Sequence, residues 1–252
     1  MMRMRCISCL AAAAIWGIAS AAAQVQDSLS AAWAICIPPR MQGHIEAPSK
    51  ASAVVEACTK VIAAVQQDRS RLSLAFTHRG VAHGALQQLP KAVADFSDAI
   101  RLDPLNAEAR FQRATALLDL GKDEESVADY TALFRLDPTD AEAWNNRGVA
   151  YARLEQLDRA IADWTRAIAI KPHYAEAYSS RGYTYFLSGS QEKALADLNE
   201  AVRWRPRYPV ALAHRGLVLE RLNKQTQAKE DYEAVLRAQP VTGSPDFRAR
   251  AR

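Results

Sequence analysis

Apolar residues recur at helical spacing in two short neighbouring stretches, residues 141–154 and 158–170. In the first stretch, Trp144, Gly148 and Tyr151 fall on one stripe of a helix, with polar residues around them. The pattern therefore predicts two consecutive amphipathic helices. The same pair of patterns returns along the chain with a period of 34 residues, so the chain is expected to consist of repeated helical hairpins.

Three kinds of position recur in five successive units, and each has a physical reading. A small residue lets the two helices of a pair approach closely, a bulky residue fills the space between pairs, and a proline ends the second helix. The small residues are Gly80, Ala114, Gly148, Gly182 and Gly216. The bulky residues are Phe96, Tyr130, Trp164, Leu198 and Tyr232. The prolines are Pro104, Pro138, Pro172, Pro206 and Pro240.

This pattern resembles the tetratricopeptide repeat, whose succession of bulky, small and proline positions is met most fully in the third unit. The matching residues there are Trp144, Gly148, Tyr151, Ala160, Trp164, Ala167 and Pro172. The resemblance implies an all-α fold, a right-handed α-solenoid of helix-turn-helix repeats. Its expected repeats occupy 73–240, as units 73–106, 107–140, 141–174, 175–208 and 209–242, of which 107–140 departs most from the pattern.

Segments before and after the repeats are expected to have other roles. Residues 24–72 are interpreted as an N-terminal cap with a partial repeat helix, because 53–62 resembles the second helix of a repeat. A stack of repeats needs such a cap, since an end repeat otherwise leaves an apolar face open. Residues 241–252 are polar and are expected to form a flexible tail.

The beginning of the chain has the features of an export signal. Arg3 and Arg5 precede an apolar run over 6–19, and small residues follow, so cleavage is expected after Ala23. The alternative is an anchor that stays attached. The sequence thus predicts a periplasmic or secreted protein without a transmembrane span after cleavage. A tetratricopeptide chain of this kind resembles small periplasmic proteins of Gram-negative bacteria.

Cysteine usage agrees with export. Cys6 and Cys9 lie in the expected signal, which leaves Cys36 and Cys58 as an even pair in an oxidising compartment. We expect a disulfide between these two residues; the alternative is two buried free thiols. The bond would fasten the cap.

Charged residues also follow the period. Each 34-residue repeat has an Arg on its first helix and, 16 residues later, an Asp on its second helix. We interpret them as a structural ladder of ion pairs; the alternative is a row of cations that binds an acidic ligand. The arginines are Arg79, Arg113, Arg147, Arg181 and Arg215, and the aspartates are Asp95, Asp129, Asp163, Asp197 and Asp231.

Signals for catalysis are missing from the sequence. It has no phosphate-binding glycine loop and no nucleophile or paired-histidine motif, so we expect no enzyme activity, no cofactor and no metal. The composition is ordinary for a globular protein, with 49% hydrophobic and 24% charged residues. Removal of Arg3 and Arg5 reduces the formal charge from +4 to +2, which gives little reason to expect a nucleic-acid partner.

The first helices of such repeats line the concave face in this family. The residue before each repeated Arg is polar, and amide or aromatic residues lie nearby, which suits capture of a peptide. The polar positions are His78, Gln112, Asn146, Ser180 and His214, and the neighbours are Phe111, Asn145, Tyr183 and Phe186. The sequence thus favours a protein- or peptide-binding scaffold for a partner that it does not identify.

Two other functions remain open. One is a structural module that self-associates into a homo-oligomer through an open carboxy-terminal repeat. The other is a glycan or cell-wall ligand held by Tyr183, Phe186 and the amide side chains. An unused, solvated helix face is also compatible with the pattern.

Overall fold

The computed structural model describes residues 26–37, 48–65 and 67–238. The expected signal at 1–23 and the expected tail at 241–252 lie outside these ranges, and both stay predictions. In the described ranges the secondary structure is helical throughout, which confirms the all-α prediction. After a helical stretch over 26–36 come α2 (Pro48–Ala64), α3 (Arg69–Ala85), α4 (Leu89–Leu102), α5 (Ala107–Asp119), α6 (Asp123–Leu133), α7 (Ala141–Arg153), α8 (Leu157–Ile170), α9 (Ala175–Leu187), α10 (Gln191–Trp204), α11 (Pro209–Arg221) and α12 (Gln225–Ala238).

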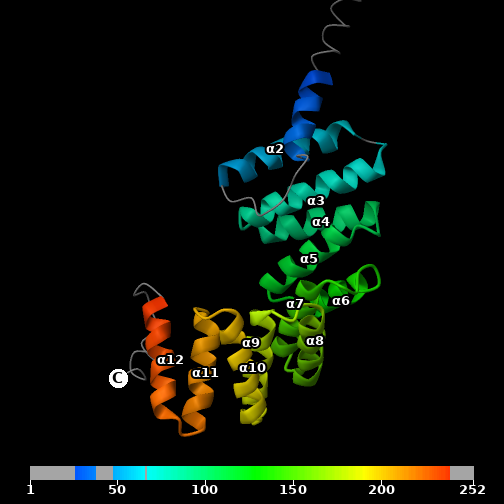
Figure 1. Cartoon of the computed structure of the whole chain (residues 1–252). Coiled ribbons are helices and arrows are strands. Elements are labelled where there is room, and N and C mark those ends of the chain that lie inside the picture. The colour runs from blue at the N-terminus through cyan, green and yellow to red at the C-terminus, as the bar shows by residue number, and fades with distance from the viewer. Residues whose placement is uncertain (1–25, 38–47, 66, 239–252) are drawn as a thin grey trace, which may run out of the picture. The chain divides into compact units, whose positions relative to one another are not determined.

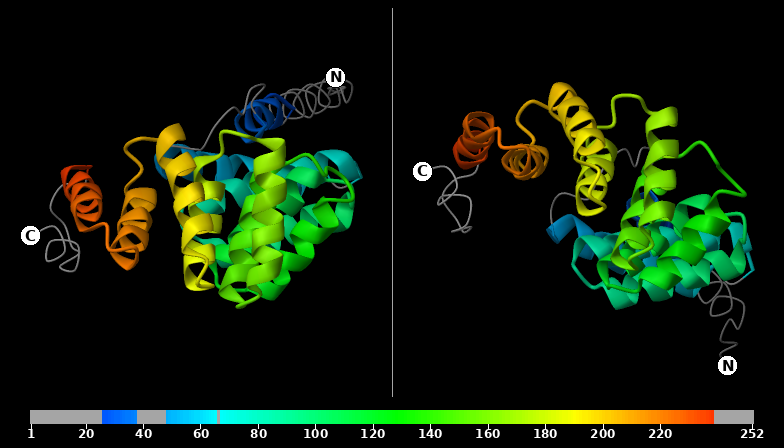
Figure 2. Two further views of the ribbon diagram at one scale, coloured as in Figure 1. Left: turned by 60° about the horizontal axis from the view of Figure 1, so that its bottom comes forward. Right: turned by 90° about the horizontal axis from the view of Figure 1, so that it is seen from below.

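The chain forms two compact units, residues 1–120 and 121–252, called unit 1 and unit 2 below. In unit 1, α2 packs on α3, α3 on α4, and α4 on α5. In unit 2, each helix from α6 to α12 packs on the next, as Figures 1 and 2 show for α9 to α12. First helices also pack on each other, α3 on α5 and α7 on α9 on α11. The boundary falls inside 107–140, the expected repeat that departs most from the pattern.

Short polar signals at the helix ends explain where the helices begin and turn. The side chain of Asp140 accepts hydrogen bonds from the amides of Glu142 and Ala143, and Asn106 caps α5 in the same way. Within each pair, one residue of the turn has a positive φ. These residues recur every 34 positions, at Gln87, Gly121, Glu155, Gly189 and Asn223.

The core of each unit is built from the recurring small and bulky residues. The bulky positions are buried, with Phe96 and Trp164 at 2% exposure and the other three at 0%. A Cβ added to Gly148 would lie 2.8 Å from Nε1 of Trp164, so the small position is required by the close approach of α7 and α8. This agrees with the role that the periodicity predicts.

A disulfide joins Cys36 at the end of the first helical stretch to Cys58 in α2. Both cysteines are fully buried, in a cluster that includes Ala32, Val61 and Ala82. Ala82 belongs to α3, so the cluster fastens the N-terminal helices onto the first complete repeat.

Candidate functional site

The predicted ion pairs are present in four of the five repeats. In each, Nε and Nη2 of the arginine donate to the two carboxylate oxygens of the aspartate 16 residues later. For Arg147 and Asp163 the distances are 2.7 and 2.8 Å. The other pairs are Arg79 with Asp95, Arg181 with Asp197, and Arg215 with Asp231. Arg113 and Asp129 belong to one repeat, but the boundary between the two compact units falls between them, and their pairing stays a prediction.

The third nitrogen of each guanidinium reaches back to the preceding repeat or cap, a contact that the sequence reasoning missed. Nη1 of Arg147 donates to Oγ1 of Thr131 at 2.9 Å. Because that hydroxyl donates its own hydrogen to the carbonyl oxygen of Val127, its oxygen is free to accept. The acceptors recur with the 34-residue period apart from the first, and they are Thr59, Ser97, Thr131, Thr165 and Asn199.

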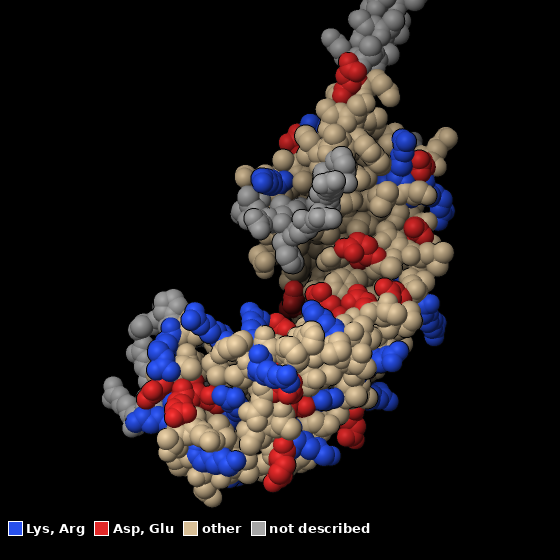
Figure 3. All heavy atoms as spheres, viewed as in Figure 1, with Lys and Arg blue, Asp and Glu red and all other residues tan. Residues whose placement is uncertain are grey.

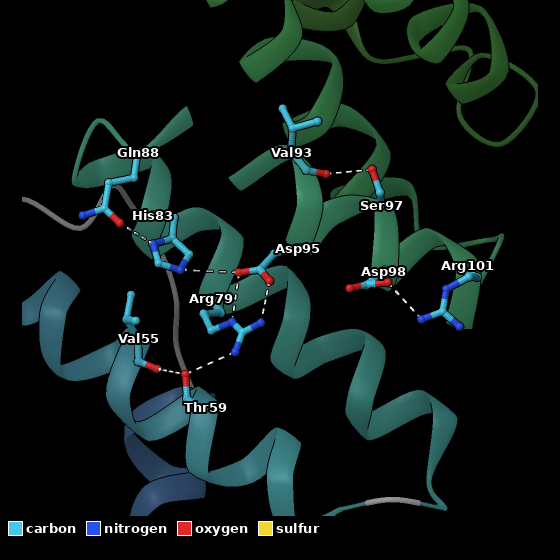
Figure 4. A network of polar contacts seen from close by, with 10 residues as sticks. All are labelled: Val55, Thr59, Arg79, His83, Gln88, Val93, Asp95, Ser97, Asp98 and Arg101. Carbon is cyan, nitrogen blue, oxygen red and sulfur yellow. Dashed lines mark hydrogen bonds and ion pairs between the residues drawn. The ribbon is translucent and has the colours of Figure 1, made fainter. Parts of the chain in front are cut away.

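Figure 4 shows one such rung in unit 1. Arg79 lies between Asp95 and Thr59, and His83 lies beside Arg79 next to the same carboxylate. Nε2 of His83 is 3.8 Å from Oδ2 of Asp95, and its Nδ1 is 2.9 Å from Oε1 of Gln88. His83 takes the position that Tyr151 and Tyr185 occupy in the third and fourth repeats, so it completes the rung rather than a separate site.

The ladder arginines are committed to protein partners and are poor candidates for an acidic ligand. The side chains of Arg147 and Asp163 are only 12% and 6% exposed. Burial raises the pKa of Asp163, and the hydrogen bonds and positive charge of Arg147 oppose that shift. The carboxylate is therefore buried at a cost that its arginine offsets.

A groove of about 600 Å³ lies in unit 1 between the first helices α3 and α5, with α4 beneath it. It contains two of the predicted ligand residues, His78 and Gln112. Burial lowers the pKa of His78, while the charge of Glu108 acts to raise it. Nε2 of Gln112 donates to Oε1 of Glu108 at 2.7 Å. The groove thus combines polar groups that can bind a peptide backbone with apolar surface.

A second group of predicted residues meets in unit 2, where α9 and α11 pack together. The ring of Tyr183 stacks on His214 with centroids 4.1 Å apart, and on Phe186 at 6.2 Å. Oγ of Ser179 lies 3.4 Å from Nδ1 of His214. Burial lowers the pKa of His214 to about 4, so its ring is uncharged at neutral pH. We call these four residues the aromatic cluster.

The other predicted residues are placed differently. Asn145 was expected to face a ligand; it is only 8% exposed, and Nε1 of Trp164 donates to its backbone carbonyl oxygen. Its side-chain nitrogen donates to Oδ1 of Asn146 at 3.1 Å. Asn146, Ser180 and Phe111 are half-buried on first helices, and Phe111 does not line the groove.

The groove includes residues that the sequence reasoning did not select, among them Leu74, Val81, Thr115 and Asp119. Leu74, Val81 and Thr115 lie about one helical turn from a selected residue and Asp119 about two turns from Gln112, so the spacing on α3 and α5 could have identified them. The described residues contain no group of three or more side chains suited to a metal ion. The arrangement offers hydrogen bonding and apolar contact, which is the chemistry of binding.

Two further surface properties bear on possible partners. On the face of unit 2 shown in Figure 3, basic and acidic side chains are interspersed and form no single basic patch. Of the helices in the described ranges, none has both the length and the apolar content required to cross a membrane.

Comparison with known families matches the repeats directly. Models described as Tetratricopeptide repeat match residues 141–174, 175–208 and 210–242, and one described as TPR repeat matches 114–155. No curated protein sequence matches the chain.

Solved structures share the fold at low sequence identity. YrrB, described as a TPR protein with an unusual peptide-binding site, is 19% identical with a TM-score of 0.59, over 75% of this chain and 95% of its own. MamA from Desulfovibrio magneticus RS-1 is 21% identical with a TM-score of 0.61, over 71% and 100%. PilF from Pseudomonas aeruginosa is 15% identical with a TM-score of 0.62, over 69% and 79%.

Proposed function

The chain belongs to the tetratricopeptide repeat family, and from this we propose that it is a non-catalytic scaffold in the bacterial cell envelope that binds a peptide or protein partner. Members of this family generally act as scaffolds without catalysis. Each unit presents its own first-helix face for binding, formed by α3 and α5 in unit 1 and by α7, α9 and α11 in unit 2. The groove between α3 and α5 is the observation that carries the proposal.

The groove suits a peptide for two reasons. Gln112 and Thr115 follow one another along α5 and offer polar groups at the spacing of successive helical turns. Opposite them, Leu74 is 44% exposed and Val81 is half-buried on α3, so apolar side chains of a ligand find a contact there. The aromatic cluster adds contact area in unit 2 with few rotatable bonds to immobilise.

The test is crosslinking in cells with a photoreactive residue in place of Gln112 or Tyr183. Arg166, an exposed residue on a second helix, is the control position. Scaffold function predicts that the same partner is captured from the first-helix face and not from position 166. Equal capture at all three positions would contradict a binding role for this face.

The envelope location is supported by the sequence of residues 1–23 and by the disulfide, which is typical of exported proteins. Mass spectrometry of the protein isolated from an envelope fraction tests it. A chain that begins at Gln24 is the expected product. A chain that retains Met1 and stays in the cytosolic fraction would contradict the proposal.

A glycan ligand at the aromatic cluster is the second candidate. Tyr183 and Phe186 lie together as that hypothesis requires, but one face of the Tyr183 ring is covered by His214. Retention of the protein on isolated sacculi, reduced by Phe186→Ala, would favour the glycan over a peptide.

A further inference from the structure

The groove in unit 1 has two unlike walls. On α3, one helical stripe of the lining is largely apolar and consists of Leu74, His78, Val81 and Ala85, with Thr77 and two glycines beside it. On α5, the lining is mainly polar and consists of Glu108, Gln112, Thr115 and Asp119, with the buried Ala116 beside them. A chain lying between these helices would meet apolar surface on one side and polar surface on the other.

The polar wall is acidic at both of its ends. Glu108 and Asp119 are exposed, and neither lysine nor arginine occurs among the described residues that line the groove. One oxygen of Glu108 accepts from Gln112, which leaves the other available. The two acidic residues are 11 positions apart on α5, which corresponds to about 16 Å along the helix.

One segment of this chain has the complementary sequence. Residues 247–252 read FRARAR, with Phe247 and two alanines alternating with Arg248, Arg250 and Arg252. In an extended chain successive side chains point to opposite sides, so such a segment has an apolar side and a cationic side. Its six residues span about 20 Å when extended, and its outermost arginines, Arg248 and Arg252, lie about 14 Å apart, which is close to the distance between the ends of the acidic wall.

We propose that residues 247–252 of one copy bind in the groove of a second copy, with the arginines toward α5 and Phe247 toward α3. This rests on the proposed function, because it takes the groove to be a peptide site. The segment lies outside the described residues, and the inference rests on the alternation of apolar and cationic residues in its sequence.

The segment belongs to unit 2, whereas the groove lies in unit 1, and we assign the groove of a second copy as its site. Only eight residues, 239–246, separate it from α12, and they span at most about 29 Å. A contact of this kind joins different surfaces of the two copies, so it produces head-to-tail assemblies.

Self-association through the last repeat itself has less support. The exposed positions of α12 are mainly polar, including Gln225, Lys229, Glu230 and Arg237. They do not form the apolar face that repeat stacking between copies would need.

The first experiment is sedimentation velocity of the full chain over a range of concentrations. We expect concentration-dependent association that is lost when residues 243–252 are deleted and weakened about fivefold or more by Glu108→Gln with Asp119→Asn. The matched control is Glu124→Gln with Asp158→Asn, which removes the same charge from exposed positions on second helices of unit 2 and should associate like the parent. A monomer at all concentrations, or equal association of both double variants, would overturn the proposal.

The second experiment measures binding of a labelled peptide of residues 243–252 to the deletion variant by fluorescence anisotropy. Leu74→Gln and the Glu108–Asp119 double variant should each weaken binding, and a peptide with its arginines placed together should bind more weakly than the alternating one. Equal binding of the two peptides would refute the two-walled fit. If the peptide fails to bind while position 112 still crosslinks to another protein, only this inference fails; if position 112 captures neither, the proposed function fails as well.

Discussion

Arg147 holds Asp163 of its own repeat with two parallel hydrogen bonds and Thr131 of the preceding repeat with a third. One guanidinium therefore fixes both the two helices within a repeat and the contact between repeats. Two aromatic rings also contact this guanidinium. Its Cζ lies 4.6 Å from the ring centroid of Phe134 and 4.8 Å from that of Trp144.

Replacement of this arginine should be costly. Arg147→Ala leaves Asp163 buried without its cation, and we expect a loss of about 3 kcal/mol in the free energy of unfolding. The control, Arg166→Ala, removes an exposed arginine and should change stability by less than about 0.5 kcal/mol. Urea denaturation followed by circular dichroism measures both. Unchanged stability of Arg147→Ala together with lost partner binding would reassign the arginines to a ligand site.

The hydroxyl contact between repeats can be tested separately. Thr165→Val keeps the shape of the side chain but removes the acceptor for Nη1 of Arg181. We expect a loss of about 1 kcal/mol in the free energy of unfolding, whereas Thr165→Ser should retain most of the stability. If valine and serine behave alike in thermal melts, the hydroxyl does not contribute as inferred.

Two glycines on first helices should respond in opposite directions to alanine. In Gly148→Ala the new methyl group meets the ring of Trp164, and overpacking should destabilise the protein by about 1–3 kcal/mol. Gly84→Ala meets no atom within 4 Å, so the helix propensity of alanine should stabilise it by up to about 1 kcal/mol. Melting temperatures of the two variants give the comparison, and a shift of the same sign in both would contradict the packing argument.

Acid should weaken unit 2 through His214. Its pKa is about 4 in the folded protein, against about 6.5 in an unfolded chain. Between these values the unfolded state takes up a proton that the folded state does not, so the free energy of unfolding falls as the pH falls from 6.5 to 4, by at most about 1.4 kcal/mol per pH unit. Above pH 6.5 this contribution is constant.

The variant His214→Phe keeps an aromatic ring beside Tyr183 and should make the pH dependence shallower between pH 4 and 6.5. His173→Gln, at an exposed position, should leave the slope unchanged. Denaturation at several pH values measures the slopes, and parallel curves for the parent and His214→Phe would disprove the assignment.

The disulfide should contribute to the stability of unit 1. Cys36 and Cys58 are 22 residues apart, and closing a loop of that length stabilises by about 3 kcal/mol. Double replacement by serine should lower the stability of the parent by about this amount and make it insensitive to reductant. Two alkylatable thiols in the non-reduced protein, found by mass spectrometry, would show that the bond does not form.

The periodicity of the sequence was sufficient to predict the helical hairpins, because each recurring position has one structural role. Proline ends a helix, a small residue lets two helices approach closely, and a bulky residue fills the space between pairs. The Arg–Asp pairing was visible for the same reason. The acceptor residues were missed because Thr131 and Thr165 resemble ordinary surface threonines, and Ser97 and Asn199 vary the residue type. Their role depends on the helix of the next repeat.

The groove and the burial of Asn145 were harder to predict for a related reason. A groove depends on how far apart α3 and α5 lie, which follows from the sizes of all the side chains between them. Asn145 and Asn146 are neighbours on one helix, yet only Asn145 is buried and Asn146 is half-buried. A rotation of one residue decides which amide is available, and a sequence pattern does not resolve that rotation. The division of the chain at residue 120 falls in the repeat with the weakest match to the pattern, but the periodicity alone did not predict it.

The arginine that spans two repeats restricts how this chain can lengthen or shorten during evolution. Duplication or loss of a whole 34-residue module leaves every guanidinium with a carboxylate after it and an acceptor before it. A module borrowed from another protein, with leucine at the arginine position, would leave the acceptor side chain of the preceding module without its guanidinium donor. The array is therefore expected to grow by copying its own modules rather than by accepting foreign ones.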